Sequence, residues 1–268
     1  MGVSERPRAL VFGEVAEMYE AARPGYAPQL APVVLEYAGP GGGLDAVEFG
    51  AGTGKATLAF AERGVSLSCV EPDPRMAAVL RRRTAGHPSV RVEVESFERW
   101  RPAGHYGLLL AATCWHWFDP ARRWDLAHAA LAPGGALALC WNVLRVRDEG
   151  LHARLAEIDR RFGSVASPHA QLVRADRELP GSWDSGEWPA AECRADGRFG
   201  DLREIRLREE TRYDTRTYLN YLSTVSYYRL LPERRRVRLF EALADAVDGH
   251  GGSLAFELAT DLFLARRR

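Results

Sequence analysis

Three glycines at alternate positions join an apolar segment to a helix-like segment early in the chain: Gly50, Gly52 and Gly54. Residues 44–49 form a short apolar run typical of a buried strand, and residues 55–63 have the apolar spacing of a helix. Because glycine lacks a Cβ, the backbone can turn sharply there and bring its N–H groups against a ligand at the carboxyl edge of a sheet. The pattern predicts a strand–turn–helix unit that binds a nucleotide-like cofactor.

Two familiar glycine-rich turns do not match this spacing. The dinucleotide-binding pattern G-x-G-x-x-G, counted from Gly50, requires a small residue where the chain has Lys55. A phosphate-binding P-loop that ends at Lys55 requires a glycine at Phe49 and a hydroxyl side chain at Ala56, and the chain has neither. The remaining pattern is E-x-G-x-G-x-G, which begins at the acidic residue Glu48.

The alternation of strands and helices continues beyond the turn, and an acidic residue follows the second strand. Glu71 lies about 20 positions after the glycines, where a carboxylate can accept hydrogen bonds from both hydroxyls of a ribose. A helix at residues 120–132 is expected to end in the turn Pro133-Gly134-Gly135. Further strands are expected at residues 65–70, 90–94, 106–112, 136–141, 202–212 and 254–264, and further helices at 12–21, 151–162, from 215, and at 232–247.

This ordered set resembles the class I S-adenosylmethionine-dependent methyltransferases. The resemblance covers about residues 10–141 and is carried by the E-x-G-x-G-x-G turn, by the E-P-D segment that begins at Glu71, and by the sequence L-A-P-G-G-A-L-A-L that leads into the fifth strand. It implies a Rossmann-like α/β fold with seven mostly parallel strands, the final pair antiparallel, helices on both faces, and a helical or loop cap insertion. It also implies S-adenosylmethionine as the cofactor.

The resemblance assigns individual cofactor contacts. Glu71 is expected to hold the ribose, and Met76 to pack near the adenine. Residues 95–98, which follow the strand expected at residues 90–94, contact the edge of the adenine in the family. Phe97 replaces the small residue that is more common there, and its ring is expected to stack on the base. The full set of implied cofactor residues in this region is Glu48, Gly50, Ala51, Gly52, Thr53, Gly54, Glu71, Pro72, Met76, Ser96, Phe97, Glu98 and Ala112.

The sequence Arg23-Pro24-Gly25-Tyr26 near the N-terminus resembles the entry segment of many small-molecule methyltransferases, where it folds over the methionine end of the cofactor. Tyr19 and Arg23 are therefore candidates for binding the cofactor carboxylate or the substrate, because a guanidinium can donate two hydrogen bonds to one carboxylate. A purely structural ion pair of Arg23 is the alternative. Tyr26 is a candidate substrate contact.

The sequence Trp115-His116-Trp117 follows the fourth strand, where the methyl donor meets the acceptor in the resembled family. Two indoles can form a dry wall suited to a cation, and an imidazole titrates near neutral pH. We therefore expect His116 to act as a catalytic general base and Trp115 and Trp117 to contact the substrate. Core packing, with His116 hydrogen-bonded to the backbone, is the alternative. With the N-terminal segment, this run is similar to small-molecule enzymes of the trans-aconitate methyltransferase-like group.

Residues 142–200 interrupt the alternation of strands and helices with a loop rich in glycine, proline, serine and tryptophan. An insertion at the carboxyl edge of such a sheet lies over the ligand crevice, so Trp183 and Trp188 are candidate substrate contacts or, alternatively, anchors of the loop on the core. The expected organisation is a covering segment at 1–30, a cofactor-binding core at 31–141, a cap at 142–200, and C-terminal elements at 201–268 that complete the sheet.

Charge and cysteine content narrow the classes of function. The 36 basic residues balance 36 acidic ones, so no net positive field favours nucleic acid. The four cysteines and seven histidines show no close metal-ligand spacing, and no metal is expected. Because the sequence has no long apolar span and residues 1–10 lack a signal-like run, we expect a cytoplasmic protein without membrane contact.

Together these features predict methyl transfer from S-adenosylmethionine to an oxygen, nitrogen or carbon of a small-molecule acceptor, by in-line displacement at the sulfonium methyl. Two alternatives stay open. One is a protein that binds the cofactor or S-adenosylhomocysteine without transferring the methyl, and the other is a methyltransferase-like cyclase that attacks another carbon of the cofactor. The pattern specifies neither the acceptor nor the oligomeric state.

Overall fold

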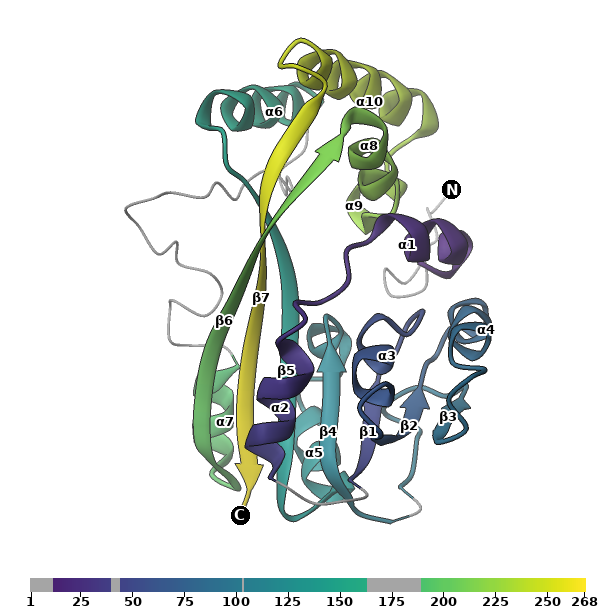
Figure 1. The fold of residues 1–268 in the computed structure, drawn as a ribbon, viewed down its shortest axis with the longest axis vertical. Helices are drawn as coiled ribbons and strands as arrows, with labels where there is room; N and C mark the ends of the chain where they lie inside the picture. The colour runs from purple at the N-terminus through teal and green to yellow at the C-terminus, as the bar shows by residue number, and fades with distance from the viewer. Residues whose placement is uncertain (1–11, 40–43, 103, 163–188) are drawn as a thin grey trace. The chain divides into compact units, whose positions relative to one another are not determined.

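The structure, a computed structural model, describes residues 12–39, 44–102, 104–162 and 189–268. Among these residues the strands form a seven-stranded sheet in the order β3-β2-β1-β4-β5-β7-β6 (Figure 1). Strands β3, β2, β1, β4 and β5 are parallel, whereas the arrow of β7 points the opposite way. The predicted Rossmann-like sheet is confirmed. Its strands are β1 (Asp45–Phe49), β2 (Ser66–Val70), β3 (Val90–Glu93), β4 (Tyr106–Ala112), β5 (Leu131–Val146), β6 (Phe199–Asp214) and β7 (Ser253–Arg267).

Two compact units divide the chain. Unit 1 contains Met1–Pro24, Val143–Leu179 and Arg208–Ala259, and unit 2 contains Gly25–Asn142, Pro180–Leu207 and Thr260–Arg268. Three of the boundaries fall inside β5, β6 and β7, so each of these strands contributes residues to both units. The sequence analysis divided the chain by expected function into residues 1–30, 31–141, 142–200 and 201–268. The two units are defined by contacts between residues, so this functional division stays a prediction.

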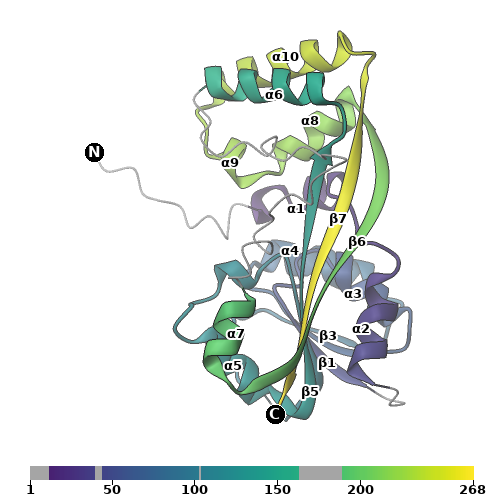
Figure 2. The same cartoon turned by 90° about the vertical axis from the view of Figure 1, so that its left-hand side faces the viewer.

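Unit 2 has helices on both faces of its sheet (Figure 2). In β4 the side chains of Leu108 and Leu110 pack into one core and those of Leu109 and Ala111 into the other, as the two-residue period of a strand requires. Both cores are apolar, which explains why the strand reads as a continuous hydrophobic run. The helices are α2 (Leu30–Ala38), α3 (Lys55–Ala61) and α4 (Pro74–Arg83) on one face, and α5 (Arg123–Ala130) and α7 (Ala190–Asp196) on the other.

The parallel register aligns the carboxyl ends of the central strands. Phe49, the last residue of β1, pairs with Val70 of β2 and with Ala111 of β4. The segments that follow these three strands therefore leave the sheet at the same edge. In folds of this kind ligands bind at that edge.

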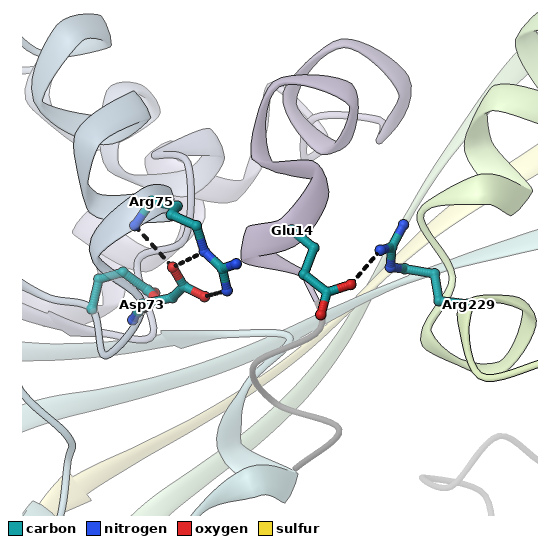
Figure 3. A network of polar contacts seen from close by, with 5 residues as sticks. Glu14, Asp73, Arg75 and Arg229 are labelled. Carbon is teal, nitrogen blue, oxygen red and sulfur yellow. Dashed lines mark hydrogen bonds and ion pairs between the residues drawn. The ribbon is translucent and has the colours of Figure 1, made fainter. Parts of the chain in front are cut away.

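In unit 1, helices pack around the parts of β5, β6 and β7 that belong to this unit, which are residues 143–146, 208–214 and 253–259. Its core includes Leu155, Tyr218 and Leu243, all of them buried. The N-terminal segment is tied in by an ion pair in which the Arg229 guanidinium donates to the Glu14 carboxylate at 2.7 Å (Figure 3). Its helical elements are a 3-10 turn η2 (Gly13–Val15), α1 (Ala16–Ala22), α6 (Glu149–Arg161), α8 (Thr215–Ser223), α9 (Ser226–Arg229) and α10 (Glu233–Asp248).

The turn expected at residues 133–135 was wrong, because that segment lies inside β5. Gly134 takes a left-handed φ of +76°, and the pairing of β4 with β5 shifts register between Tyr106 and Leu108. A glycine in this conformation lets a strand bulge and continue. The strand consequently starts at Leu131 instead of residue 136, and β6 and β7 also extend beyond the predicted ends.

The helix expected at residues 120–132 is shorter than predicted. Asp119 forms a local turn in which its carboxylate accepts from Ala121 N–H at 2.9 Å and its carbonyl accepts from Arg122 N–H at 3.0 Å. Short polar side chains compete with the helix in this way. As a result, α5 starts only at Arg123.

Gly50 provides a test of how closely the turn after β1 packs against the turn after β4, at the carboxyl edge of the sheet. A Cβ at this position would lie 2.7 Å from Cys114 Cβ, and its φ is +62°. We expect Gly50→Ala to lower the free energy of unfolding by about 1–2 kcal/mol for the left-handed backbone and by about 1–3 kcal/mol more for overpacking. Chemical denaturation measures both contributions together.

Gly64→Ala is the matched control. Gly64 has a φ of +78°, but a Cβ added there would meet nothing within 4 Å, so only the backbone cost of about 1–2 kcal/mol is expected. Equal losses in the two variants would contradict the close packing of the two turns.

Candidate active site

The glycine-rich turn between β1 and α3 lies at the carboxyl edge of the sheet. Gly50, Gly52 and Gly54 all have left-handed backbone angles, with φ of +62°, +59° and +90°. Gly50 N–H donates to the Val70 carbonyl at 2.8 Å, which ties the turn to the end of β2. A Cβ on Gly52 would lie 3.6 Å from Met76 Cε. The structure thus brings the predicted glycines and methionine together.

Glu71 follows β2, and its carboxylate accepts hydrogen bonds from two backbone segments. Oε2 accepts from Gly52 N–H at 2.8 Å, and Oε1 accepts from Asp73 N–H at 2.9 Å. Burial raises the pKa of Glu71 to about 7, although both hydrogen bonds favour the ionised form. Each carboxylate oxygen has a further lone pair, so the group can also accept from a pair of vicinal hydroxyls.

Asp73 fixes the segment that contains Glu71 and Pro72 to the start of α4. Its carboxylate accepts from Arg75 N–H at 2.8 Å and pairs with both ends of the Arg75 guanidinium (Figure 3). Burial by itself would raise the pKa of Asp73, but the hydrogen bonds from Arg75 lower it below the ordinary value. Asp73 is therefore a helix cap, which leaves Glu71 as the carboxylate next to the glycine turn.

Glu48 lies in β1 beneath the turn and is buried. Its Oε2 accepts from Thr57 Oγ1 at 2.7 Å, and Thr57 belongs to α3. Burial raises the pKa of Glu48 to about 8. In this arrangement the side chain joins β1 to α3, and a direct contact of Glu48 with the cofactor stays a prediction.

Phe97 lies in a cluster of aromatic rings beside the turn. Its ring stacks on Phe118 with centroids 4.2 Å apart, and it meets Phe49 edge-on at 4.5 Å. Trp115 lies 6.1 Å away, measured between ring centroids. Phe97 is buried and its ring stacks on Phe118, so its stacking on adenine stays a prediction.

The remaining residues assigned to the adenine side lie in the segment after β3 and at the end of β4. Ser96 N–H donates to the Glu95 carboxylate at 2.9 Å, and Glu98 accepts from Asp119 N–H at 3.3 Å. Ala112 ends β4 and is half-buried. Their cofactor contacts stay predictions.

The chain leaves β4 through a strained residue that the sequence analysis did not single out. Thr113 has a φ of +59°, which is uncommon for a β-branched residue, and strain of this kind concentrates at functional sites. Its N–H donates to the Cys140 carbonyl at 2.7 Å, and its hydroxyl is 2.9 Å from the Tyr26 hydroxyl. This contact holds Tyr26 at the carboxyl end of β4, close to the Trp-His-Trp sequence. The sequence analysis predicts substrate contacts both at Tyr26 and in that sequence.

The Trp-His-Trp sequence forms a 3-10 turn, η3 (Trp115–Trp117), whose residues differ in exposure. Trp115 is fully buried, with the Arg123 guanidinium 5.9 Å from its ring centroid, so it packs in the core. Trp117 is 38% exposed and lies 4.7 Å from the His116 ring, measured between centroids. The exposed members, His116 and Trp117, are the ones that can reach an acceptor.

The His116 ring is oriented by a residue from the neighbouring strand. Trp141 Nε1–H donates to His116 Nδ1 at 3.2 Å. Desolvation, followed by the positive charge of Arg123, lowers the pKa of His116 below its ordinary value. The ring is therefore neutral at physiological pH.

The entry segment is attached to the same sheet edge by a second set of hydrogen bonds. Asn142 Nδ2 donates to the Gly25 carbonyl at 2.6 Å, and Asn142 Oδ1 accepts from the Thr260 hydroxyl at 2.6 Å. Thr260 Oγ1 also accepts from Ala27 N–H at 3.4 Å. Together with the Tyr26–Thr113 contact, these bonds hold residues 25–27 beside the end of β4 and beside Asn142 of β5.

Tyr19 and Arg23 belong to unit 1. The Arg23 guanidinium donates to the hydroxyl and carbonyl of Thr224 at 2.8 and 3.0 Å and packs against the rings of Tyr19 and Tyr221. These contacts give Arg23 a structural role within unit 1, although with a hydroxyl and a carbonyl rather than the ion pair considered above. Its cofactor or substrate contact stays a prediction.

Three residues at the site were missed by the sequence analysis: Thr113, Trp141 and Asn142. A positive φ at a threonine leaves no signal in the sequence. Trp141 and Asn142 could have been noticed, because the parallel pairing of Ala112 with Cys140 places these two residues of β5 beside the segment that follows β4. The predicted contacts Trp183 and Trp188 lie outside the described residues.

Membrane spans and metal clusters are both absent from the described part of the chain. No helix there is long and apolar enough to cross a membrane. No group of three or more histidine, cysteine, aspartate or glutamate side chains is arranged to hold a metal ion in the same residues.

Comparisons with known proteins agree with this geometry. Residues 46–135 match the model of a methyltransferase domain family. The chain is 36% identical over 180 residues to an uncharacterised methyltransferase from Mycobacterium tuberculosis, which is 67% of this chain and 68% of that protein. This protein belongs to the class I S-adenosylmethionine-dependent methyltransferases.

Solved structures show the same fold. A protein from Anaeromyxobacter dehalogenans described as a type II methyltransferase superposes with a TM-score of 0.61 at 24% identity, covering 91% of this chain and 97% of that one. An S-adenosylmethionine-dependent methyltransferase from Thiobacillus denitrificans, solved with S-adenosylhomocysteine, has a TM-score of 0.52 at 15% identity, covering 94% of this chain and 96% of that one.

The residues of this methyltransferase fit the cofactor of its family. Glu71 presents a buried carboxylate beside Gly52, where a ribose diol can donate to it. The Thr53 hydroxyl is buried in the turn and has no hydrogen-bond partner among the described residues, so a polar group of a ligand can satisfy it. The buried aromatic rings around Phe97 make the neighbourhood of the same turn apolar.

The raised pKa of Glu71 predicts a pH dependence of cofactor binding. Ribose hydroxyls donate to the ionised carboxylate, which is lost as the pH falls through about 7. We expect the dissociation constant for S-adenosylhomocysteine to rise by about fivefold to tenfold between about pH 8 and about pH 6, with a proton released on binding at the lower pH. Calorimetry in two buffers of different ionisation enthalpy measures both effects.

Glu71→Gln should remove this pH dependence, because an amide does not titrate. Glu48→Gln is the matched control, since Glu48 is also buried but bonded to Thr57, and it should keep the dependence. If only Glu48→Gln lost the pH dependence of cofactor binding, Glu48 and not Glu71 would be the carboxylate that titrates, and the prediction would be wrong.

Proposed function

We propose that this methyltransferase transfers the methyl group of S-adenosylmethionine to a small-molecule acceptor. The observation that carries the proposal is the sharing of one sheet edge by two groups of residues. Gly52 follows β1 and Glu71 follows β2, whereas His116 and Trp117 follow β4. These segments leave the sheet at one edge, because Phe49 of β1 pairs with both neighbouring strands close to their carboxyl ends. A cofactor seated on the first group is thus supported close to the second.

The residues on the β1 and β2 side would bind and orient the cofactor. Glu71 would accept from the ribose hydroxyls, Met76 would pack near the adenine, and the turn at Gly52 would let the backbone approach closely. When bound, S-adenosylmethionine supplies a methyl group activated by a positively charged sulfonium. The reaction forms a bond between that methyl and the acceptor, breaks the methyl–sulfur bond and leaves S-adenosylhomocysteine.

The residues on the β4 side would receive the acceptor. Tyr26 is held by Thr113, and Trp117 is exposed beside His116. A sulfonium methyl requires alignment and desolvation, and a base only where the attacking atom is protonated. The sequence-based prediction assigns that base to His116. The balanced charge of the chain supports a small molecule over a nucleic acid as the acceptor.

Product analysis tests the proposed reaction. We expect the protein, incubated with S-adenosylmethionine and a panel of small carboxylates, amines and phenols, to form S-adenosylhomocysteine and a methylated acceptor, both measured by mass spectrometry. Methylthioadenosine instead would indicate the cyclase-like chemistry. Cofactor binding without either product across the panel would favour a non-catalytic binding protein.

Glu71→Ala tests the cofactor assignment itself. Loss of the ribose acceptor should weaken S-adenosylhomocysteine binding by about 1–3 kcal/mol, or about fivefold to 150-fold. Glu62→Ala is the control, because Glu62 is an exposed glutamate at the end of α3. Unchanged affinity in a folded Glu71→Ala protein would contradict the role of Glu71.

A further inference from the structure

One nitrogen of the His116 ring is already used as a hydrogen-bond acceptor. An indole N–H can only donate, so the 3.2 Å contact from Trp141 Nε1 requires an unprotonated His116 Nδ1. A neutral imidazole carries one proton, which must then be on Nε2. Nε2 has no hydrogen-bond partner among the described residues, and the side chain is exposed. The ring therefore offers an N–H group at the site.

The backbone around Thr113 produces this arrangement. The β4–β5 pairing continues one step past Ala112, because Thr113 N–H donates to the Cys140 carbonyl at 2.7 Å. The left-handed conformation of Thr113 then turns the chain into η3, and His116 meets the residue that follows Cys140. Trp141 is thus placed beside His116 by strand register and not by a flexible loop.

We infer that His116 acts as a hydrogen-bond donor to the acceptor molecule through Nε2–H, and that Trp141 is the positioning residue that fixes this tautomer. The inference rests on the proposed function and replaces the general base of the sequence-based prediction. A hydrogen bond of ordinary net strength biases a tautomer ratio by about tenfold. To accept a proton at Nε2, the ring would first have to move its proton to Nδ1 and lose the bond from Trp141.

A fixed N–H donor narrows the class of acceptor. The atom that faces Nε2 must carry a lone pair, and its proton is not removed by His116. The acceptor that fits attacks through an atom that is already unprotonated near neutral pH and keeps a second lone pair, such as an oxyanion. An uncharged amine does not fit, because the hydrogen bond from Nε2–H would occupy its only lone pair. Alignment, and not proton abstraction, is then the contribution of His116.

The tautomer can be measured directly in the free protein. In protein labelled with ¹⁵N-histidine, two-bond proton–nitrogen NMR separates protonated from unprotonated ring nitrogens, and the His116 signals are identified by their loss in His116→Gln. We expect an unprotonated Nδ1 and a protonated Nε2 in the wild type, and a mixture of tautomers in Trp141→Phe. Trp117→Phe is the control, because it removes a neighbouring indole but leaves the Trp141 bond. A protonated Nδ1 in the wild type, or an unchanged pattern in Trp141→Phe, would overturn the inference.

The donor role is tested by the choice of replacement at residue 116. Glutamine places an amide N–H near the position of Nε2 but accepts no proton at neutral pH, whereas asparagine places its amide near Nδ1. We expect His116→Ala and His116→Asn to lower turnover by about a hundredfold, and His116→Gln to stay within about tenfold of the wild type. Glutamine as poor as alanine, at unchanged cofactor affinity, would instead identify a general base.

Cofactor affinity separates this inference from the proposed function. All variants should bind S-adenosylhomocysteine as the wild type does, because His116 and Trp141 are on the acceptor side. A wild-type protein that does not bind S-adenosylhomocysteine would refute the proposed function, and the NMR result would still decide the tautomer.

Discussion

The absence of a side chain at Gly50 is the constraint on which the site depends. The turn after β1 and the turn after β4 approach so closely that a Cβ on Gly50 would overlap Cys114, whose thiol donates to the Phe49 carbonyl at 2.9 Å. This contact sets the distance between the residues that would hold the cofactor and those that would meet the acceptor. Any larger residue at Gly50 would move one group away from the other.

Two buried carboxylates beneath these turns have different roles, and their hydrogen bonds decide which is which. Glu48 bonds to a threonine of α3, whereas Glu71 accepts from backbone N–H groups of two segments that line the site. Burial raises the pKa of both, so neither is fully ionised in the free protein near neutral pH. A ligand with vicinal hydroxyls compensates the cost of ionising Glu71, which couples its binding to pH.

On the acceptor side the structure divides a single sequence motif between core and surface. Trp115 packs against aromatic rings in the core, while His116 and Trp117 face outward from the same turn. The turn takes this form because Thr113 adopts a left-handed conformation that hydrogen bonds to Cys140 and Tyr26 hold in place. Backbone strain is thus used to orient an imidazole, and the neighbouring strand supplies its partner.

The sequence by itself determined the order of the strands along the chain and the Rossmann-like sheet, and it predicted which residues at one edge of that sheet would hold the cofactor. Glycine spacing, apolar runs and the acidic residue after β2 are local signals, and each is confirmed as part of the fold. The sequence missed the bulge at Gly134, the strained Thr113 and the bond from Trp141 to His116. These depend on strand register and on contacts between residues distant in the chain. Only the tertiary structure could decide which nitrogen of His116 carries the proton, because the partner that decides it belongs to another strand.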